Sequence, residues 1–198
     1  MAITRGYATL AQVKSALRIT DTVDDDLLEM AIESASRAID SYTNRNFYNA
    51  GTAVRVFAPN DSLTVTTDDL ISISSLQTMS DTDDTFDTTW TATDFQLEPL
   101  NGVVDGIAQP YTQIRAVGDY LFLELAGEAT VKVTGVWGWT ATPIQVTQAT
   151  VIQSSRIFKR LDSPLGIISG ELGSMRVGSR LDPDVAQLVD SLRKIRMA

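Results

Sequence analysis

The spacing of apolar residues changes twice along this 198-residue chain, and this change constrains the fold more than any other feature. In residues 1–50 apolar side chains recur every three or four positions, as on one face of an amphipathic helix. Between residues 51 and 142, short β-prone segments follow one another, separated by turn sequences such as Asn101-Gly102. Helical spacing returns in residues 143–198. The pattern predicts an α+β fold: a small helical bundle from the N- and C-terminal parts, with a β-rich insertion between them.

Two helices are predicted in residues 1–50, the first part of the helical core. Thr9 and Gln12 fit a capping box, in which each side chain bonds the other residue's backbone N–H. A second helix is predicted to begin at Asp24, where three consecutive carboxylates suit the positive end of a helix dipole. Its predicted apolar stripe is Leu28, Ala31, Ile32, Ala35, Ile39 and Tyr42.

The insertion, residues 51–142, is rich in threonine, which favours strands over helices. Four short segments have strand character: Val54–Phe57, Ile71–Ile73, Tyr120–Leu125 and Val131–Val133. They predict several short strands joined by long loops.

The second part of the helical core, residues 143–198, begins at Thr142-Pro143. A threonine cap, a proline at the first helical position and Gln145 at the third coincide there. This helix is predicted to run to about Leu161, with Ile144, Val151, Phe158 and Leu161 on one face. A glycine-rich loop over 162–181 and a last helix over 182–196 are predicted to follow.

The last helix is amphipathic and basic at its end. Its apolar stripe is Val185, Leu188, Val189, Leu192 and Ile195, and its basic residues are Arg193, Lys194 and Arg196. A helix on a glycine-rich tether suits docking into a groove of a partner protein. The alternative is that the helix packs on the core of its own chain.

Composition removes most catalytic chemistry. The chain has no histidine and no cysteine, which removes the commonest general base and metal ligand together with thiol chemistry, disulfides and cysteine-bound zinc. Carboxylate catalysis remains open, and Asp94, Glu98 and Glu124 lie among aromatic residues, but no spacing selects a pair. No phosphate-binding or dinucleotide motif is present. We therefore predict no enzymatic activity, no catalytic residues, no metal and no cofactor.

Charge is unevenly distributed. The formal net charge is -9; the segment between Arg55 and Arg115 holds ten acids and no basic residue, whereas residues 143–198 hold eight basic residues and five acids. The run Asp81–Asp87 resembles a calcium loop but has Phe86 where an EF-hand needs glycine, so a solvated loop is the preferred interpretation. No segment has the length and apolarity of a membrane span or signal peptide, and no membrane association is expected.

Two tryptophans flank a glycine in Trp137-Gly138-Trp139, where strand patterning gives way to helix. The preferred interpretation is that they seal the junction between the insertion and the helical core. The alternative is an exposed aromatic platform for a partner or a sugar.

Several motifs, in this order, resemble the head–tail connector (adaptor, or head-completion) proteins of tailed bacteriophages. They are Tyr7–Lys14, Ile19–Asp21, Asp25–Leu28, Ala35–Asp40, Arg45–Tyr48, Gly135–Trp139 with Pro143, and Phe158–Gly166. The resemblance covers both ends, roughly half of the chain, while the middle is not diagnostic. Phage-derived gene-transfer agents use the same kind of adaptor, so that origin stays open.

The resemblance implies a structural virion protein that forms a ring, usually a dodecamer, beneath the portal protein. The ring would connect the capsid to a tail or stopper protein in the virion neck, after assembly in the host cytoplasm. DNA would pass through its lumen without specific binding. The C-terminal segment would reach the portal, through Val185, Leu188, Val189, Leu192, Ile195, Arg193, Lys194 and Arg196.

Two other functions stay open on the sequence alone. One is a non-enzymatic virion binding module whose β insertion recognises a partner or a glycan. The other is a carboxylate enzyme, for which no site can be named.

Overall fold

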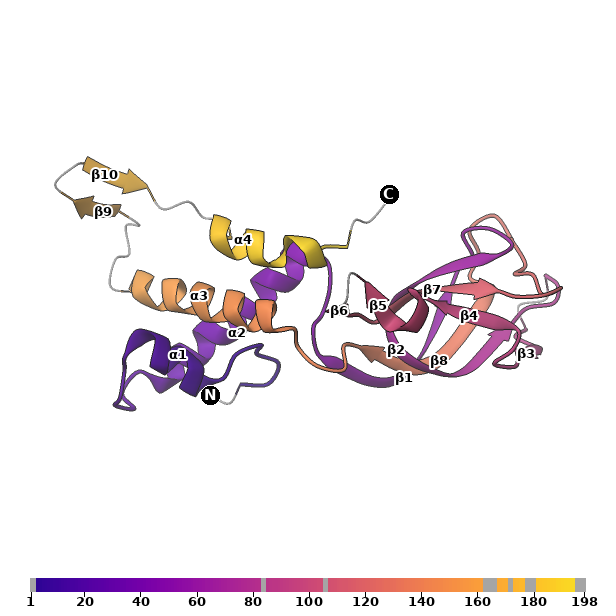
Figure 1. Cartoon of the computed structure of the whole chain (residues 1–198), viewed down its shortest axis with the longest axis horizontal. Coiled ribbons are helices and arrows are strands. Elements are labelled where there is room, and N and C mark those ends of the chain that lie inside the picture. Colours follow the sequence, from indigo (N-terminus) through magenta and orange to yellow (C-terminus); the bar gives the residue numbers. More distant parts are fainter. Residues whose placement is uncertain are drawn as a thin grey trace. The chain divides into compact units, whose positions relative to one another are not determined.

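A computed structural model shows four α-helices and an antiparallel sheet, which confirms the predicted α+β class (Figure 1). It describes residues 3–82, 85–104, 107–161, 167–170, 173–176 and 181–194. The chain divides into two compact units. Residues 1–47 with 142–198 form the helical unit, and residues 48–141 form the β unit.

The first two helices of the helical unit form as their sequence predicts. Helix α1 (Leu10–Leu17) begins with the Thr9–Gln12 capping box, whose two reciprocal hydrogen bonds are both present. Helix α2 (Asp25–Thr43) has the predicted inward face, because Leu28, Ile32 and Ile39 are fully buried. Tyr42 lies only half-buried at its end. Asn44 ends the helix in the left-handed conformation.

Helix α3 (Ile144–Leu161) packs against α2, but with a different face from the one predicted. Its fully buried residues are Val146, Ala149, Thr150 and Ser154, whereas Ile144 and Leu161 are exposed. The Thr150 hydroxyl donates to the Val146 carbonyl oxygen at 2.8 Å, and that of Ser154 donates to the Thr150 carbonyl oxygen at 2.6 Å. Because these hydroxyls are satisfied within the helix, polar residues can face the core. The apolar stripe predicted for this helix is therefore wrong at both ends.

The start of α3 also differs in detail. The Thr142 hydroxyl donates to the Phe47 carbonyl oxygen at 2.9 Å, and the Pro143 carbonyl oxygen accepts the first helical N–H groups. Thr142 thus joins the two segments of the helical unit, in place of the capping role predicted for it.

The segment predicted as a glycine-rich loop, 162–181, contains two short antiparallel strands. They are β9 (Ile167–Gly170) and β10 (Gly173–Arg176), paired from Gly173↔Gly170 to Arg176↔Ile167. Strand pairing satisfies backbone groups that a loop would leave to water. The remainder of 162–180 lies outside the described residues.

The last helix is shorter than the predicted 182–196. Helix α4 (Pro183–Val189) is followed by one 3-10 turn, Asp190–Leu192, and Arg193 is extended. The backbone N–H of Lys194 donates to the Thr43 carbonyl oxygen at 2.8 Å, and the Asn44 side chain donates to the Lys194 carbonyl oxygen. The chain leaves the helix early because its backbone bonds the C-terminal end of α2 instead.

The β unit is built on one antiparallel sheet in the order β1-β8-β2-β7-β4, with β3 paired to β2. Its strands are β1 (Asn49–Phe57), β2 (Thr64–Thr78), β3 (Thr88–Trp90), β4 (Phe95–Glu98), β7 (Tyr111–Ala116) and β8 (Val131–Gly138). A separate pair is formed by β5 (Val103–Val104) and β6 (Ile107–Ala108), after the 3-10 turn Leu100–Gly102. The core of this unit includes Val65, Leu76, Ile114, Val133 and Trp137.

The strand predicted at Tyr120–Leu125 does not form. These residues have no strand assignment, although Phe122 is buried and stacks on Trp90 with ring centroids 4.7 Å apart. The Phe122 N–H donates to the Ser62 carbonyl oxygen at 2.8 Å. The alternation of apolar and polar residues in this segment therefore does not indicate a strand. It occurs in a loop in which the buried side chain is that of Phe122.

Replacing residues 48–141 with a short glycine-serine linker is expected to leave a folded, mostly helical protein. The hydrogen bond between Thr142 and Phe47 places the two ends of the excised segment side by side. A short linker can therefore close the gap at little entropic cost. Far-UV circular dichroism during heating is the measurement, and one cooperative helical transition is the expected result. A molten or insoluble product would contradict the separation into two units.

Candidate functional site

Of the residues predicted to contact a portal, some are buried in the structure and others are exposed. Val185 and Val189 are fully buried and Leu192 is 3% exposed, all within the helical unit. Leu188 is half-buried, Arg193 is exposed and Lys194 is half-buried. Ile195 and Arg196 lie outside the described residues. The apolar stripe of α4 is thus occupied by its own chain, as in the alternative that the sequence left open.

Polar contacts fix α4 in this position. Asp182 caps the helix by accepting the Asp184 N–H at 2.8 Å, and its carboxylate pairs with Arg156 of α3. At the other end, the guanidinium of Arg193 lies 5.4 Å from the centroid of the Tyr42 ring, and the Tyr42 hydroxyl donates to Asp190 at 3.1 Å. Helix α4 is therefore an integral part of the bundle.

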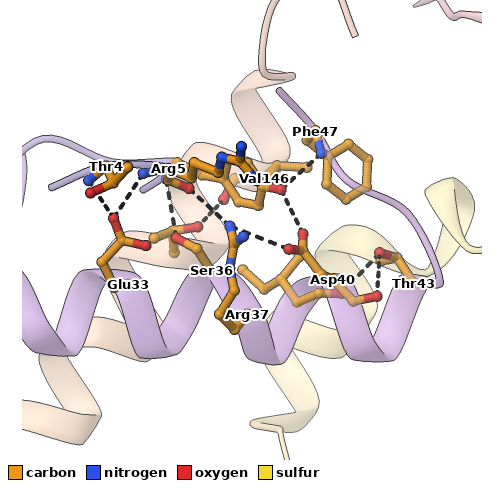
Figure 2. A network of polar contacts seen from close by, with 12 residues as sticks. Thr4, Arg5, Glu33, Ser36, Arg37, Asp40, Thr43, Phe47 and Val146 are labelled. Atoms are coloured by element: carbon orange, nitrogen blue, oxygen red, sulfur yellow. Dashed lines mark hydrogen bonds and ion pairs between the residues drawn. The ribbon is translucent and has the colours of Figure 1, made fainter. Parts of the chain in front are cut away.

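The N-terminal segment is bound along α2 by a network of hydrogen bonds (Figure 2). The backbone N–H groups of Thr4 and Arg5 both donate to one carboxylate oxygen of Glu33, at 2.5 and 2.8 Å. In return, Arg37 donates to the Arg5 carbonyl oxygen at 2.9 Å and lies 3.2 Å from Asp40. Hydrogen bonds from side chains to its backbone hold this segment in place, although it has no helix or strand of its own.

Tyr7 is the centre of this network. Its hydroxyl donates to Asp40 at 2.6 Å and accepts the buried N–H of Phe47 at 2.8 Å. Burial, followed by the hydrogen bond to Asp40, raises the pKa of Tyr7 above its usual value, so the phenol stays protonated. Burial also raises the pKa of the Asp40 carboxyl, against the lowering effects of the Tyr7 hydrogen bond and Arg37. One phenol thus links the start of the chain, α2 and the end of the first helical segment.

Substituting Tyr7→Phe is expected to lower the free energy of unfolding by about 1–3 kcal/mol, because the buried N–H of Phe47 loses its acceptor. Tyr42→Phe is the matched control, since it removes only the exposed hydrogen bond to Asp190. Urea unfolding of both variants measures the difference. Equal effects of the two substitutions would contradict a structural role for Tyr7.

The two tryptophans of the Trp-Gly-Trp motif are buried within the β unit. Trp137 is fully buried, and its indole N–H donates to the Ala53 carbonyl oxygen at 2.9 Å. Trp139 is 3% exposed and donates to Asp69 at 2.9 Å. Gly138 has a φ of +98°, and a Cβ there would lie 2.0 Å from the Tyr48 carbonyl oxygen. The motif therefore offers no exposed aromatic platform for a partner or a sugar.

The three candidate catalytic acids, Asp94, Glu98 and Glu124, have different surroundings. Asp94 accepts hydrogen bonds from the Thr91 N–H and hydroxyl, at 2.6 and 2.7 Å, and these hold its pKa below the usual range. Glu98 is paired with Arg115 at 2.7 Å, and Glu124 is exposed. A general acid in glycoside hydrolysis needs a raised pKa, which is the opposite of the shift at Asp94.

Acids from the runs Asp81–Asp87 and Asp24–Asp26 form hydrogen bonds and ion pairs within the chain. Asp87 accepts from the Ser80 N–H and hydroxyl, and Asp25 pairs with Lys14 at 2.6 Å. Asp83 and Asp84 lie outside the described residues. Within the described part of the chain, no cluster of three or more acidic, histidine or cysteine side chains is arranged to hold a metal. Nor does any described helix have the length and apolarity to cross a membrane.

Comparison with known proteins supports the resemblance seen in the sequence. Residues 7–80 match the family model described as "Phage gp6-like head-tail connector protein", so the predicted resemblance is confirmed over this part of the chain. No curated protein matches the sequence.

Solved structures share the fold along the whole chain. A chain from the neck of an empty gene-transfer-agent particle, computed with sixfold symmetry, is 18% identical, with a TM-score of 0.57. The match covers 100% of this chain and 95% of that one. A chain from the neck of a native particle, computed with twelvefold symmetry, is 16% identical with a TM-score of 0.56, over 100% and 94% of the two chains. A third, from a native gene-transfer-agent virion, is 18% identical with a TM-score of 0.56, over 100% and 95%.

Proposed function

We propose that this chain, whose residues 7–80 match the head–tail connector family, is a structural subunit of the neck of a tailed phage or gene-transfer-agent particle. The observation that carries the proposal is that the whole chain, with its β unit, has the fold of chains found in particle necks. The role is mechanical: the protein joins a capsid to a tail and performs no chemical reaction. Its place in the cell is the host cytoplasm during assembly and the virion neck afterwards.

The subunits are proposed to form a closed ring. The similar chains come from necks treated with sixfold and twelvefold symmetry, which supports a dodecamer here. A ring of identical subunits needs two different complementary surfaces on each subunit, because every contact is head-to-tail. The ring is proposed to contact the portal on one side and a tail or stopper protein on the other.

The portal contact is proposed to involve the C-terminal end, with a smaller role for α4 than its sequence suggested. Arg193 and Lys194 come directly after the 3-10 turn that follows α4, and Ile195 and Arg196 follow them in the sequence. Val185, Val189 and Leu192 are needed inside the bundle, whereas Leu188 is half-buried and can contribute at the edge. Basic side chains at this end suit an acidic surface on the partner.

Native mass spectrometry of the chain, alone and mixed with the cognate portal, tests the proposal. We expect a closed ring, in at least one of the two conditions, whose mass is a whole multiple of the 21.5 kDa subunit. A chain that stays monomeric in both conditions and does not bind the portal would refute the connector role.

Duplex DNA is expected not to bind measurably to the subunit or to the ring. A conduit must let DNA slide, and tight binding arises when basic side chains neutralise phosphates and release counterions. A net charge of -9 per subunit, repeated around a ring, opposes adsorption of a polyanion. Fluorescence anisotropy with a labelled duplex at physiological salt is the measurement. Binding at about 1 μM or tighter that weakens steeply with salt would indicate a protein that grips DNA.

A further inference from the structure

We infer that the outward face at the start of α2 binds the basic C-terminal end of α3 of a second copy of this chain. The inference rests on the proposed ring and names the two surfaces that join its subunits. It is carried by exposed apolar side chains, by complementary charge on two helices, and by the place of both surfaces in the bundle.

The first surface is an apolar stripe that the chain itself leaves uncovered. Val23, Leu27 and Met30 are 85%, 43% and 50% exposed. Leu27 and Met30, three positions apart in α2, share a face that points away from the buried Leu28 and Ile32. Val23 lies in the turn just before the helix. Large apolar side chains exposed close together at the start of a helix are typical of a protein contact surface.

The same face continues toward the C-terminal end of α2 with small residues. Ser34 and Ser41 are exposed and Ala38 is half-buried. Small side chains leave room for a neighbouring backbone to approach closely. This face is therefore apolar at its start and lined by small side chains along the rest. Such a face allows another helix to pack closely along it.

The charges on the two helices are opposite. Helix α2 carries five acids and one basic residue, Arg37, and the exposed Asp26 lies beside the apolar stripe. Helix α3 carries three basic residues and no acid. At its end Lys159 and Arg160 are exposed next to Leu161, which is itself 55% exposed. Each surface thus combines an apolar contact with charge of one sign, and the two signs complement each other.

Both surfaces lie at the same end of the helical bundle. Phe158, near the end of α3, packs on the cluster that contains Val13 and Leu28, and Leu28 is in the first turn of α2. A contact between these two surfaces therefore joins neighbouring subunits at the same level. A head-to-tail contact closes into a ring when it rotates each subunit without a step along the axis, and two surfaces at the same level are compatible with that condition. A second copy is thus the occupant that the chain's own features favour.

A charge exchange on the full-length protein tests the contact, with ring formation followed by native mass spectrometry under the conditions in which the wild type forms rings. Asp26→Lys and Lys159→Glu are each expected to reduce the ring population about tenfold. The chain that carries both substitutions is expected to recover it. Met30→Asp is expected to abolish rings, and Val54→Asp is the matched control, since Val54 is 59% exposed in the β unit. All four sites are exposed, so each variant should remain folded. Asp26→Lys and Lys159→Glu each reverse a charge that suits its helix end, so a small fall in the melting temperature is expected for these two, and cooperative melting confirms that the fold is kept.

The outcomes separate this inference from the proposed function. If the wild type forms no ring with or without the portal, the connector proposal itself fails. If the wild type forms rings and Met30→Asp and the charge variants do so equally well, the inference is wrong. Loss of rings in both single charge variants without recovery in the double variant would also overturn the assigned pairing.

Discussion

Truncation of the chain after Leu181 is expected to unfold the helical unit. The cut removes Val185, Val189 and Leu192, which are buried against the remaining helices. Burial of each large apolar side chain contributes about 1.5–3 kcal/mol, so the loss approaches the total stability of about 5–15 kcal/mol typical of a domain. The measurement is far-UV circular dichroism during heating, and we expect the cooperative helical transition to be lost.

Truncation after Lys194 is the matched control. It removes only residues 195–198 and keeps both α4 and the hydrogen bond between Lys194 and Thr43. This shorter cut should leave the melting curve unchanged while weakening portal binding. If the chain cut after Leu181 melts like the full-length protein, α4 is a separable docking element, as its sequence alone suggested.

Substituting Trp137→Ala is expected to destabilise the β unit by about 3–5 kcal/mol, the usual cost of deleting a large buried aromatic side chain. The ring is fully buried, lies 5.5 Å from that of Phe57 between centroids, and has the Arg55 guanidinium 4.5 Å from its centroid. The Ala53 carbonyl oxygen also loses a donor.

Hydrogen exchange resolved by peptide measures this effect separately in the two units. In the Trp137→Ala variant we expect protection to fall throughout β1, β2 and β8 and to persist in α2 and α3. Trp137→Phe, which keeps most of the apolar volume, should cost less than the alanine variant. Unchanged protection in the β strands would contradict the role of Trp137 as the centre of this core.

Local signals explain which elements could be predicted from sequence. The Thr9–Gln12 capping box and the stripe from Leu28 to Ile39 involve residues three or four positions apart, so their sequence determines the geometry. By contrast, Thr150 and Ser154 look polar in sequence yet occupy the buried face of α3, because their hydroxyls bond within the helix. Nothing in a polarity pattern distinguishes this case from a solvent-facing one.

Long-range contacts explain most of what could not be predicted. Phe122 is anchored to Ser62, sixty residues earlier, so the local strand pattern around it was misleading. Tyr7 meets Asp40 and Phe47 across more than thirty residues, and no spacing in the chain indicates that network. The amphipathic stripe of α4 is the same whether its partner is its own chain or another protein, so only the packed bundle decides between them.

The exposed face of α2 could be predicted only in part. Helical spacing assigns Leu28 and not Leu27 to the buried stripe, but it does not show whether a partner protein covers Leu27. Packing of the bundle buries Leu28 and leaves Leu27 exposed. The surface proposed to join subunits therefore consists of α2 residues that remain exposed after the helical unit has packed.

The most direct test of the connector role is cryo-electron microscopy of the neck in particles that contain this protein. We expect a closed ring between portal and tail into which this chain fits, with twelvefold symmetry and with its C-terminal end toward the portal. A neck whose density is accounted for without this chain, or particles in which the chain lies elsewhere, would contradict the account.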